Sequence, residues 1–159
     1  MKSIEDLVRV HPFLEGVDDA SIKLMAGCAR NVSFDTDHYL LREGATANHF
    51  YLIRRGVVAL ESFVPGREPI TFETLKECDF LGVSWLVPPY KWHFDARAVE
   101  PVQTVEFDAA CLRGKCEANH DLGYELMKRF VPAIMKRLQA ARIQCMDIYG
   151  CPPVGGGVS

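Results

Sequence analysis

The chain has 159 residues, of which 48% are apolar and 25% are charged. A chain of this length can build one hydrophobic core but is short for two domains of ordinary size. Its formal net charge of −3 lacks the basic excess of most nucleic-acid-binding proteins, so we expect no nucleic-acid partner. The N-terminus is acidic where a signal peptide needs positive charge, and no stretch approaches the roughly 18 apolar residues of a membrane span. We therefore expect a cytoplasmic protein that does not bind membranes.

The six cysteines are scattered through apolar segments rather than grouped. No Cys-x-x-Cys pair occurs, and the chain shows no export signal that would favour disulfides. We therefore predict reduced thiols and no iron–sulfur cluster. The positions are Cys28, Cys78, Cys111, Cys116, Cys145 and Cys151.

Two short helical pieces are predicted within residues 4–30. Leu7 and Val8 lie in an amphipathic turn, and Pro12 interrupts it. Asp18 and Asp19 can cap a second helix, which carries apolar residues at helical spacing.

Residues 31–108 have the texture of an all-β segment. Short runs rich in Val, Ile, Phe, Tyr and Thr are broken by Gly, Pro, Asp and Asn. Pro65-Gly66 predicts a hairpin turn, because Pro presets one turn dihedral and Gly accepts a positive φ at the next position. The predicted strands are Val32–Phe34, Tyr39–Arg42, Phe50–Ile53, Val57–Phe63, Ile70–Leu75, Phe94–Ala98 and Val102–Phe107.

Helical periodicity returns at residues 109–149. We predict one helix over 109–118 and a longer one over 121–148, bent or divided at Pro132. Residues 150–159 have the composition of a disordered tail. The longer helix carries an apolar seam spaced four and three residues apart, suited to packing on its own β segment or on a second copy. We call these residues the seam: Met127, Val131, Ile134, Leu138, Ala141, Cys145 and Ile148.

The order of elements resembles that of cyclic-nucleotide-binding domains of catabolite-activator-type regulators, kinase regulatory subunits and gated channels. The run of strand, Gly44, aromatic strand, Gly56 and Val57 resembles the family pattern, and Cys78 to Gly82 is similar to the entry of its phosphate-binding cassette. A further family glycine falls on Asp37, which tolerates a left-handed turn. The resemblance covers residues 11–148. It implies an α+β fold with an antiparallel β-roll, or jelly roll, flanked by N-terminal and C-terminal helices, all in one domain over residues 1–149.

The resemblance also implies where a cyclic nucleotide would be held, and two of those side chains are replaced. The family's ribose-binding Glu falls on Val83, and its phosphate-binding Arg falls on Trp92, with Lys91 beside it. Losing both contacts should remove several kcal/mol of binding, at about 1.5–3 kcal/mol for each charged hydrogen bond. We therefore predict that cyclic AMP does not bind in the usual mode.

Aromatic side chains instead crowd this segment, which suits a filled pocket, a rebuilt site for another small ligand or a surface patch that binds a protein partner. The candidate ligand-binding residues are Gly82, Val83, Ser84, Trp85, Leu86, Lys91, Trp92, His93, Phe94 and Asp95.

Other chemistries find little support. The five histidines are isolated, so no cupin-type metal site is expected, and no nucleophile triad, Walker loop or paired carboxylate suggests an enzyme or a cofactor. The basic residues of the last helix fit a solvated face. We therefore expect a stand-alone regulatory or sensor domain in signal transduction, with a homodimer formed through the seam. The alternative is a ligand-free adaptor subunit whose protein partner the sequence does not identify.

Overall fold

The structure is a computed structural model that describes residues 2–148. It falls into two compact parts with the boundary after Gly123. The helices are α1 (Ile4–Val10), η1 (Pro12–Leu14), α2 (Asp19–Ala26), η2 (Ser84–Leu86), α3 (Ala109–Ala118) and α4 (His120–Ile148). The strands are β1 (Ala29–Phe34), β2 (Tyr39–Leu41), β3 (His49–Arg55), β4 (Val58–Ser62), β5 (Ile70–Leu75), β6 (Phe80–Leu81), β7 (Asp95–Ala98) and β8 (Val102–Asp108).

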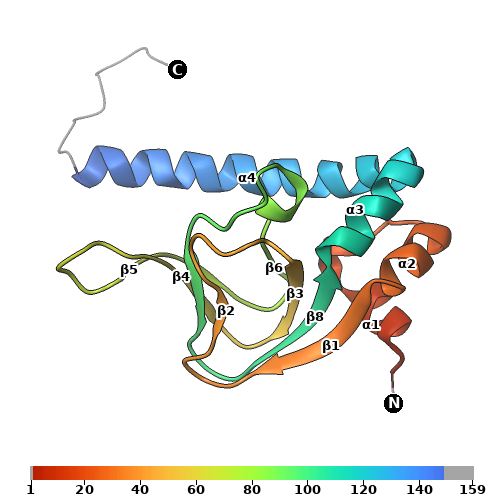
Figure 1. Ribbon diagram of the computed structural model, residues 1–159, viewed down its shortest axis with the longest axis horizontal. Coiled ribbons are helices and arrows are strands. Elements are labelled where there is room, and N and C mark those ends of the chain that lie inside the picture. Colours follow the sequence, from red (N-terminus) through yellow and green to blue (C-terminus); the bar gives the residue numbers. More distant parts are fainter. Residues whose placement is uncertain (1, 149–159) are drawn as a thin grey trace, which may run out of the picture. The chain divides into compact units, whose positions relative to one another are not determined.

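Two four-stranded sheets form the β-roll (Figure 1). One sheet has the order β1-β8-β3-β6 and the other β2-β7-β4-β5, and neighbouring strands are antiparallel. Strands that are distant in the chain therefore pair, as β1 does with β8. This arrangement confirms the predicted α+β fold with an antiparallel β-roll.

An aromatic stack lies in the core of the roll. The ring of Phe50 on β3 lies between those of Trp85 and Phe107, with centroid distances of 4.9 Å and 4.6 Å. All three side chains are fully buried. Such stacks contribute about 0.5–1.5 kcal/mol per pair beyond the burial of apolar area.

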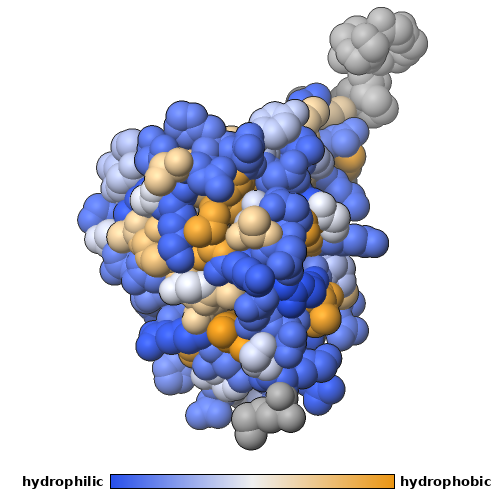
Figure 2. Space-filling model, turned by 90° about the vertical axis from the view of Figure 1, so that its right-hand side faces the viewer, coloured by the Kyte–Doolittle hydropathy of each residue, from blue (hydrophilic) through white to orange (hydrophobic). Residues whose placement is uncertain are grey.

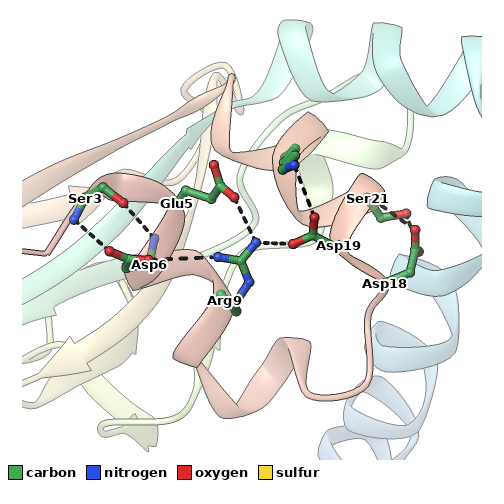
Figure 3. Close-up of polar contacts among 8 residues, drawn as sticks. Ser3, Glu5, Asp6, Arg9, Asp18, Asp19 and Ser21 are labelled. Atoms are coloured by element: carbon green, nitrogen blue, oxygen red, sulfur yellow. Dashed lines mark hydrogen bonds and ion pairs between the residues drawn. The ribbon is translucent and has the colours of Figure 1, made fainter.

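The N-terminal helices are fixed by caps and by one arginine (Figure 3). Ser3 and Asp6 form a capping box at the start of α1, and Asp18 caps α2. Arg9 pairs with Glu5 on its own helix and with Asp19 at the start of α2. The two predicted helical pieces are confirmed, and this ion-pair cluster links them.

The strand boundaries differ from prediction by a few residues, and three short elements, η1, β6 and η2, were missed. β1 begins at Ala29 rather than Val32, and β3 extends to Arg55. β6 and η2 have two and three residues, which is too short for a periodic signal. The left-handed turn at Asp37, with φ of 70°, and that at Gly66, with φ of 78°, are both present as expected.

Helix α4 is continuous through Pro132, so the predicted division there is wrong. Its buried residues are Leu122, Leu126 and Phe130, four positions apart. The seam residues from Met127 onward are exposed or half-buried instead, Leu138 by 61%. The side chain of Ile148 and residues 149–159, including the predicted tail, lie outside the described part of the chain.

The prediction of six reduced cysteines is wrong for one pair. Cys28 and Cys111 form a disulfide, with their Cα atoms 5.8 Å apart and a sequence separation of 83 positions. Cys78, Cys116 and Cys145 are free thiols. The sequence offered no signal for the pair, because only the pairing of β1 with β8 brings the two ends together.

The visible face in Figure 2 carries small groups of apolar residues among hydrophilic ones. Within residues 2–148, no helix combines the length and the apolar character needed to cross a bilayer.

Candidate functional site

The candidate site is the segment of residues 82–95, which links β6 to β7. It begins at Gly82, whose φ of +103° lies in a region that favours glycine. Val83 follows as the N-cap of η2 without a side-chain cap hydrogen bond, and Ser84, Trp85 and Leu86 form that single turn. The backbone thus turns sharply at the position where the family resemblance places ligand phosphate.

The indole of Trp92 packs directly on Gly82. A Cβ atom on Gly82 would lie 2.6 Å from Cη2 and 2.8 Å from Cζ3 of this ring, closer than real Cβ contacts. Trp92 is only 4% exposed. Glycine at position 82 therefore serves two purposes, the positive φ and the close approach of the indole.

Backbone hydrogen bonds hold Trp92 in this place. Its N–H donates to the carbonyl of Ala45 at 3.0 Å, and its carbonyl accepts from Gly44 N–H at 2.9 Å. Ala47 N–H donates to the carbonyl of Tyr90 at 2.7 Å. Main-chain hydrogen bonds therefore join the loop between β2 and β3 to the segment before β7. This pairing sets the position of the indole.

Trp85 has a different role from Trp92, although both were predicted to line one pocket. Its ring stacks on Phe50 in the core and is fully buried. Its carbonyl accepts a hydrogen bond of 2.6 Å from Arg113 Nη1 on α3, and the guanidinium of Arg113 also lies 4.2 Å from the centroid of the Tyr90 ring. One arginine thus fixes both η2 and the loop that follows it.

The polar candidates point to separate partners. Lys91 is exposed and its Nζ donates to Thr46 Oγ1 at 3.3 Å. Asp95 Oδ1 accepts from Glu43 N–H at 2.7 Å. His93 is exposed, and Phe94 is half-buried with its ring 5.7 Å from that of Phe72 in an edge-on contact.

Between the two runs of candidate residues, 82–86 and 91–95, the structure shows a direct contact of Gly82 with Trp92. Val83, Ser84 and Leu86 are half-buried around η2, whereas Lys91, His93 and Asp95 are occupied or exposed elsewhere. The predicted set consists of two runs of one segment, residues 82–86 and 91–95, and whether it binds a ligand stays a prediction.

A buried acid lies on the neighbouring strand β4. Glu61 is 5% exposed, and Arg97 on β7 donates to its two carboxylate oxygens at 3.2 Å each. Arg97 also pairs with the exposed Asp37 at 2.8 Å. The hydrogen bonds that Arg97 donates to Glu61 raise the pKa of Arg97 above its usual value. This guanidinium is already committed to two carboxylates rather than offered to an anionic ligand.

Sequence reasoning missed Arg113 and the pair of Glu61 and Arg97. Arg113 lies 28 residues after Trp85 on another element, so no local spacing could connect them. Glu61 and Arg97 stand on strands whose pairing sets opposite charges diagonally across the sheet, and that register is not readable from the chain alone. Among residues 2–148, no group of three or more His, Cys, Asp or Glu side chains could hold a metal ion.

Comparison with known proteins agrees with this architecture. A family model described as the cyclic nucleotide-binding domain matches residues 31–119. A candidate cyclic nucleotide-binding protein from Geobacter metallireducens is 32% identical over 87% of this chain and 99% of its own, with a TM-score of 0.74. A comparison with curated proteins finds no match.

More distant structures share the fold. The sensor domain of the transcriptional regulator DNR from Pseudomonas aeruginosa is 19% identical, with a TM-score of 0.68 over 85% of this chain and 91% of its own. The regulatory domain of Toxoplasma gondii PKA, crystallised with cAMP, is 22% identical, with a TM-score of 0.60 over 70% of this chain and 42% of its own. With the β-roll, the cassette position of Gly82 and the family match all in agreement, this chain belongs to the cyclic nucleotide-binding domain family.

Proposed function

We propose that this chain acts in the cytoplasm as a stand-alone, non-enzymatic regulatory domain that does not bind cyclic AMP in the usual mode. Residues 1–149 would work as one domain, and segment 82–95 would be its control region. The observation that carries the proposal is the contact of Trp92 with Gly82. An indole that touches the cassette glycine occupies space that a bound phosphate and sugar would need.

The chemistry of the segment supports the same conclusion. Position 83 carries Val, which offers no acceptor for a ribose hydroxyl, and position 92 carries an indole in place of a guanidinium. Arg97, on β7 at the end of the segment, is held by Glu61 and Asp37. η2 has only three residues, so few aligned peptide dipoles face an anion.

Isothermal titration with cyclic AMP and cyclic GMP tests this proposal. We expect no binding by the wild type at 25 °C up to about 100 μM ligand, which corresponds to a binding free energy weaker than about −5.5 kcal/mol. The double variant Val83→Glu, Trp92→Arg restores the acid and the guanidinium and should gain measurable binding. Submicromolar binding by the wild type would overturn the proposal.

A matched control places the same chemistry nearby. The variant Val87→Glu, Lys91→Arg puts an acid and a guanidinium at exposed positions of the same segment. It should show no binding of either cyclic nucleotide. Because Trp92→Arg removes a buried ring, circular dichroism must first show that the double variant is folded. If the double variant is not folded, Trp92→Ala serves as the second variant, because it removes the indole from Gly82 without adding charge.

The packing of Trp92 also favours a ligand-free adaptor over a sensor of another small molecule. Mass spectrometry of small molecules carried through native purification separates the two functions. An adaptor should carry none, and its partner binding should be insensitive to Trp92→Ala. A bound compound lost in that variant would support the sensor.

We further propose that the chain forms a homodimer through α4. The seam is regular in sequence, and Met127, Val131, Ile134 and Leu138 are between 38% and 61% exposed in the single chain. Burying such a stripe against a second copy would remove it from water.

A further inference from the structure

The disulfide between Cys28 and Cys111 lies where three elements meet. Cys28 directly precedes β1, and Cys111 is in the first turn of α3. Asp108, at the end of β8, donates its N–H to the carbonyl of Cys28 at 2.9 Å, and its side chain caps α3 by accepting from Cys111 N–H at 2.8 Å. The covalent bond therefore fastens the start of α3 to the end of α2.

A surface cavity opens beside this bond. It has a volume of about 440 Å³, within the range of small-molecule sites, and both cysteines line it. Arg30, His49 and Glu106 line it as well. Cys28 is 8% exposed, whereas Cys111 is half-buried, so Cys111 is the more accessible residue of the two.

A polar cluster forms one wall of the cavity. Glu106 is 4% exposed and accepts a 2.6 Å hydrogen bond from Arg30 Nε, while His49 Nε2 lies 3.6 Å from the same carboxylate oxygen. Burial, followed by the charge of Glu106, raises the pKa of the neighbouring Tyr51 above its usual value. This cluster makes one wall of the cavity polar, which suits a water-soluble thiol more than a hydrophobic ligand.

The turn of α3 that carries Cys111 also contacts segment 82–95. Arg113, two residues further on, donates to the carbonyl of Trp85 and lies over the ring of Tyr90. Lys115 Nζ donates to the carbonyl of Leu24 at 2.6 Å, so α3 keeps one tie to α2 when the disulfide is open. Cleavage would therefore loosen the helix without releasing it.

We propose that Cys28–Cys111 is a thiol-exchange site, reached by low-molecular-weight thiols through this cavity, and that its reduction loosens the grip of α3 on η2. In the first step a thiolate attacks Sγ of Cys111, the Sγ–Sγ bond breaks, and the electron pair stays on Sγ of Cys28, which takes a proton from solvent. A second thiol then displaces Cys111, which leaves as a thiol once protonated. The sum is one protein disulfide and two small thiols giving two protein thiols and one small disulfide. The proposed effect of reduction on α3 and η2 does not depend on whether segment 82–95 binds a ligand.

The first experiment equilibrates the full chain with mixtures of reduced and oxidised glutathione. Alkylation and peptide mass spectrometry count the thiols at Cys28 and Cys111, and acrylamide quenching reports on segment 82–95, which contains both tryptophans of the chain. We expect a disulfide in oxidising mixtures, two thiols in reducing ones, and stronger quenching in the reduced state. Absence of the disulfide in oxidising mixtures, its persistence in excess reduced glutathione, or equal quenching in both states would overturn the proposal.

Three variants test the route from the disulfide to segment 82–95. Cys28→Ser with Cys111→Ser should show the quenching of the reduced wild type in every mixture, and Cys78→Ser, at an exposed free thiol, should behave as wild type. Arg113→Ala should show the stronger quenching even when oxidised. If oxidised Arg113→Ala keeps the quenching of the oxidised wild type, the proposed link through α3 is wrong.

Access through the cavity is tested by filling it. Ala29→Phe places a ring at a cavity-lining position of β1, and Ser33→Phe places the same ring on the same strand four residues away. We expect the rate constant of reduction by glutathione to fall by about tenfold or more in the first variant and to stay within about twofold in the second, since access limits exchange. Equal rates in the two variants would contradict entry through this cavity.

Discussion

His11 is a buried histidine whose two ring nitrogens are both engaged. Nε2–H donates to the carbonyl of Ile53 at 2.8 Å, and Nδ1 accepts from Phe13 N–H at 3.2 Å, which requires the neutral ring. Burial lowers the pKa of His11 below its usual value. The unfolded chain therefore takes up this proton at a higher pH than the folded one, and stability should decline as pH falls through about 6.5.

Urea denaturation at pH 7.5 and pH 5.5 measures this effect. We expect the free energy of unfolding to be lower at pH 5.5, and His11→Gln to lose most of that contribution while costing about 1–3 kcal/mol at pH 7.5. The control His93→Gln, at an exposed ring, should keep the wild-type pH dependence. An unchanged pH dependence in His11→Gln would show that another group is responsible.

Gly82 and Gly44 form a natural pair for measuring the Trp92 contact. Both have positive φ, +103° and +84°, but a Cβ on Gly44 would meet nothing within 4 Å. Gly44→Ala should therefore cost only backbone strain, about 1–2 kcal/mol, and Gly82→Ala should cost clearly more because the indole must move. Thermal denaturation compares the two, and equal losses would mean that Trp92 yields freely.

In segment 82–95, the sequence predicted which side chains are replaced better than it predicted where their rings lie. The resemblance to the family implies an acid at position 83 and a guanidinium at position 92, and the sequence carries Val and Trp there. That Trp85 stacks on Phe50 while Trp92 covers Gly82 could not be predicted, because the direction of each ring depends on η2 and on main-chain pairing with the loop before β3.

Between elements, the pair of Glu61 on β4 and Arg97 on β7 ties two strands of one sheet. Because Glu61 is buried, removing its partner leaves a carboxylate without compensation. We expect Arg97→Leu to cost about 3 kcal/mol, measured by urea denaturation. Asp37→Asn, which removes only the exposed partner, should change stability by less than about 0.5 kcal/mol.

The double variant Arg97→Leu, Glu61→Leu separates the pair energy from simple packing. It should be more stable than Arg97→Leu alone, since no charge remains buried. If the single and double variants are equally unstable, the guanidinium contributes through its packing and not by compensating Glu61.

Elements with a strong local signal were predictable and those fixed by long-range pairing were not. The strands at Tyr39–Leu41 and Ile70–Leu75 follow from composition and turn residues. The disulfide of Cys28 with Cys111 requires β1 to pair with β8, a contact across 83 residues that only the finished sheet creates.

At the scale of the molecule, α4 shows what periodicity can and cannot predict. The seam was correctly placed on one helix, but its spacing could not tell which apolar residues are buried within one chain. Leu122, Leu126 and Phe130 are buried, and the seam residues beside them are exposed or half-buried. The helix therefore carries two apolar stripes, and the seam is the exposed one.

The proposed homodimer would bury the seam, and sedimentation equilibrium of the full chain tests it. We expect a dimer for the wild type and a rise of at least tenfold in its dissociation constant for Leu138→Asp, since a buried Leu contributes about 1.5–3 kcal/mol and each dimer loses two. Ala140→Asp puts the same charge on an exposed residue 200° around the helix from Leu138, and it should leave the constant within about twofold. A wild type that sediments as a monomer, or two variants that weaken the dimer equally, would mean that the seam does not join two copies.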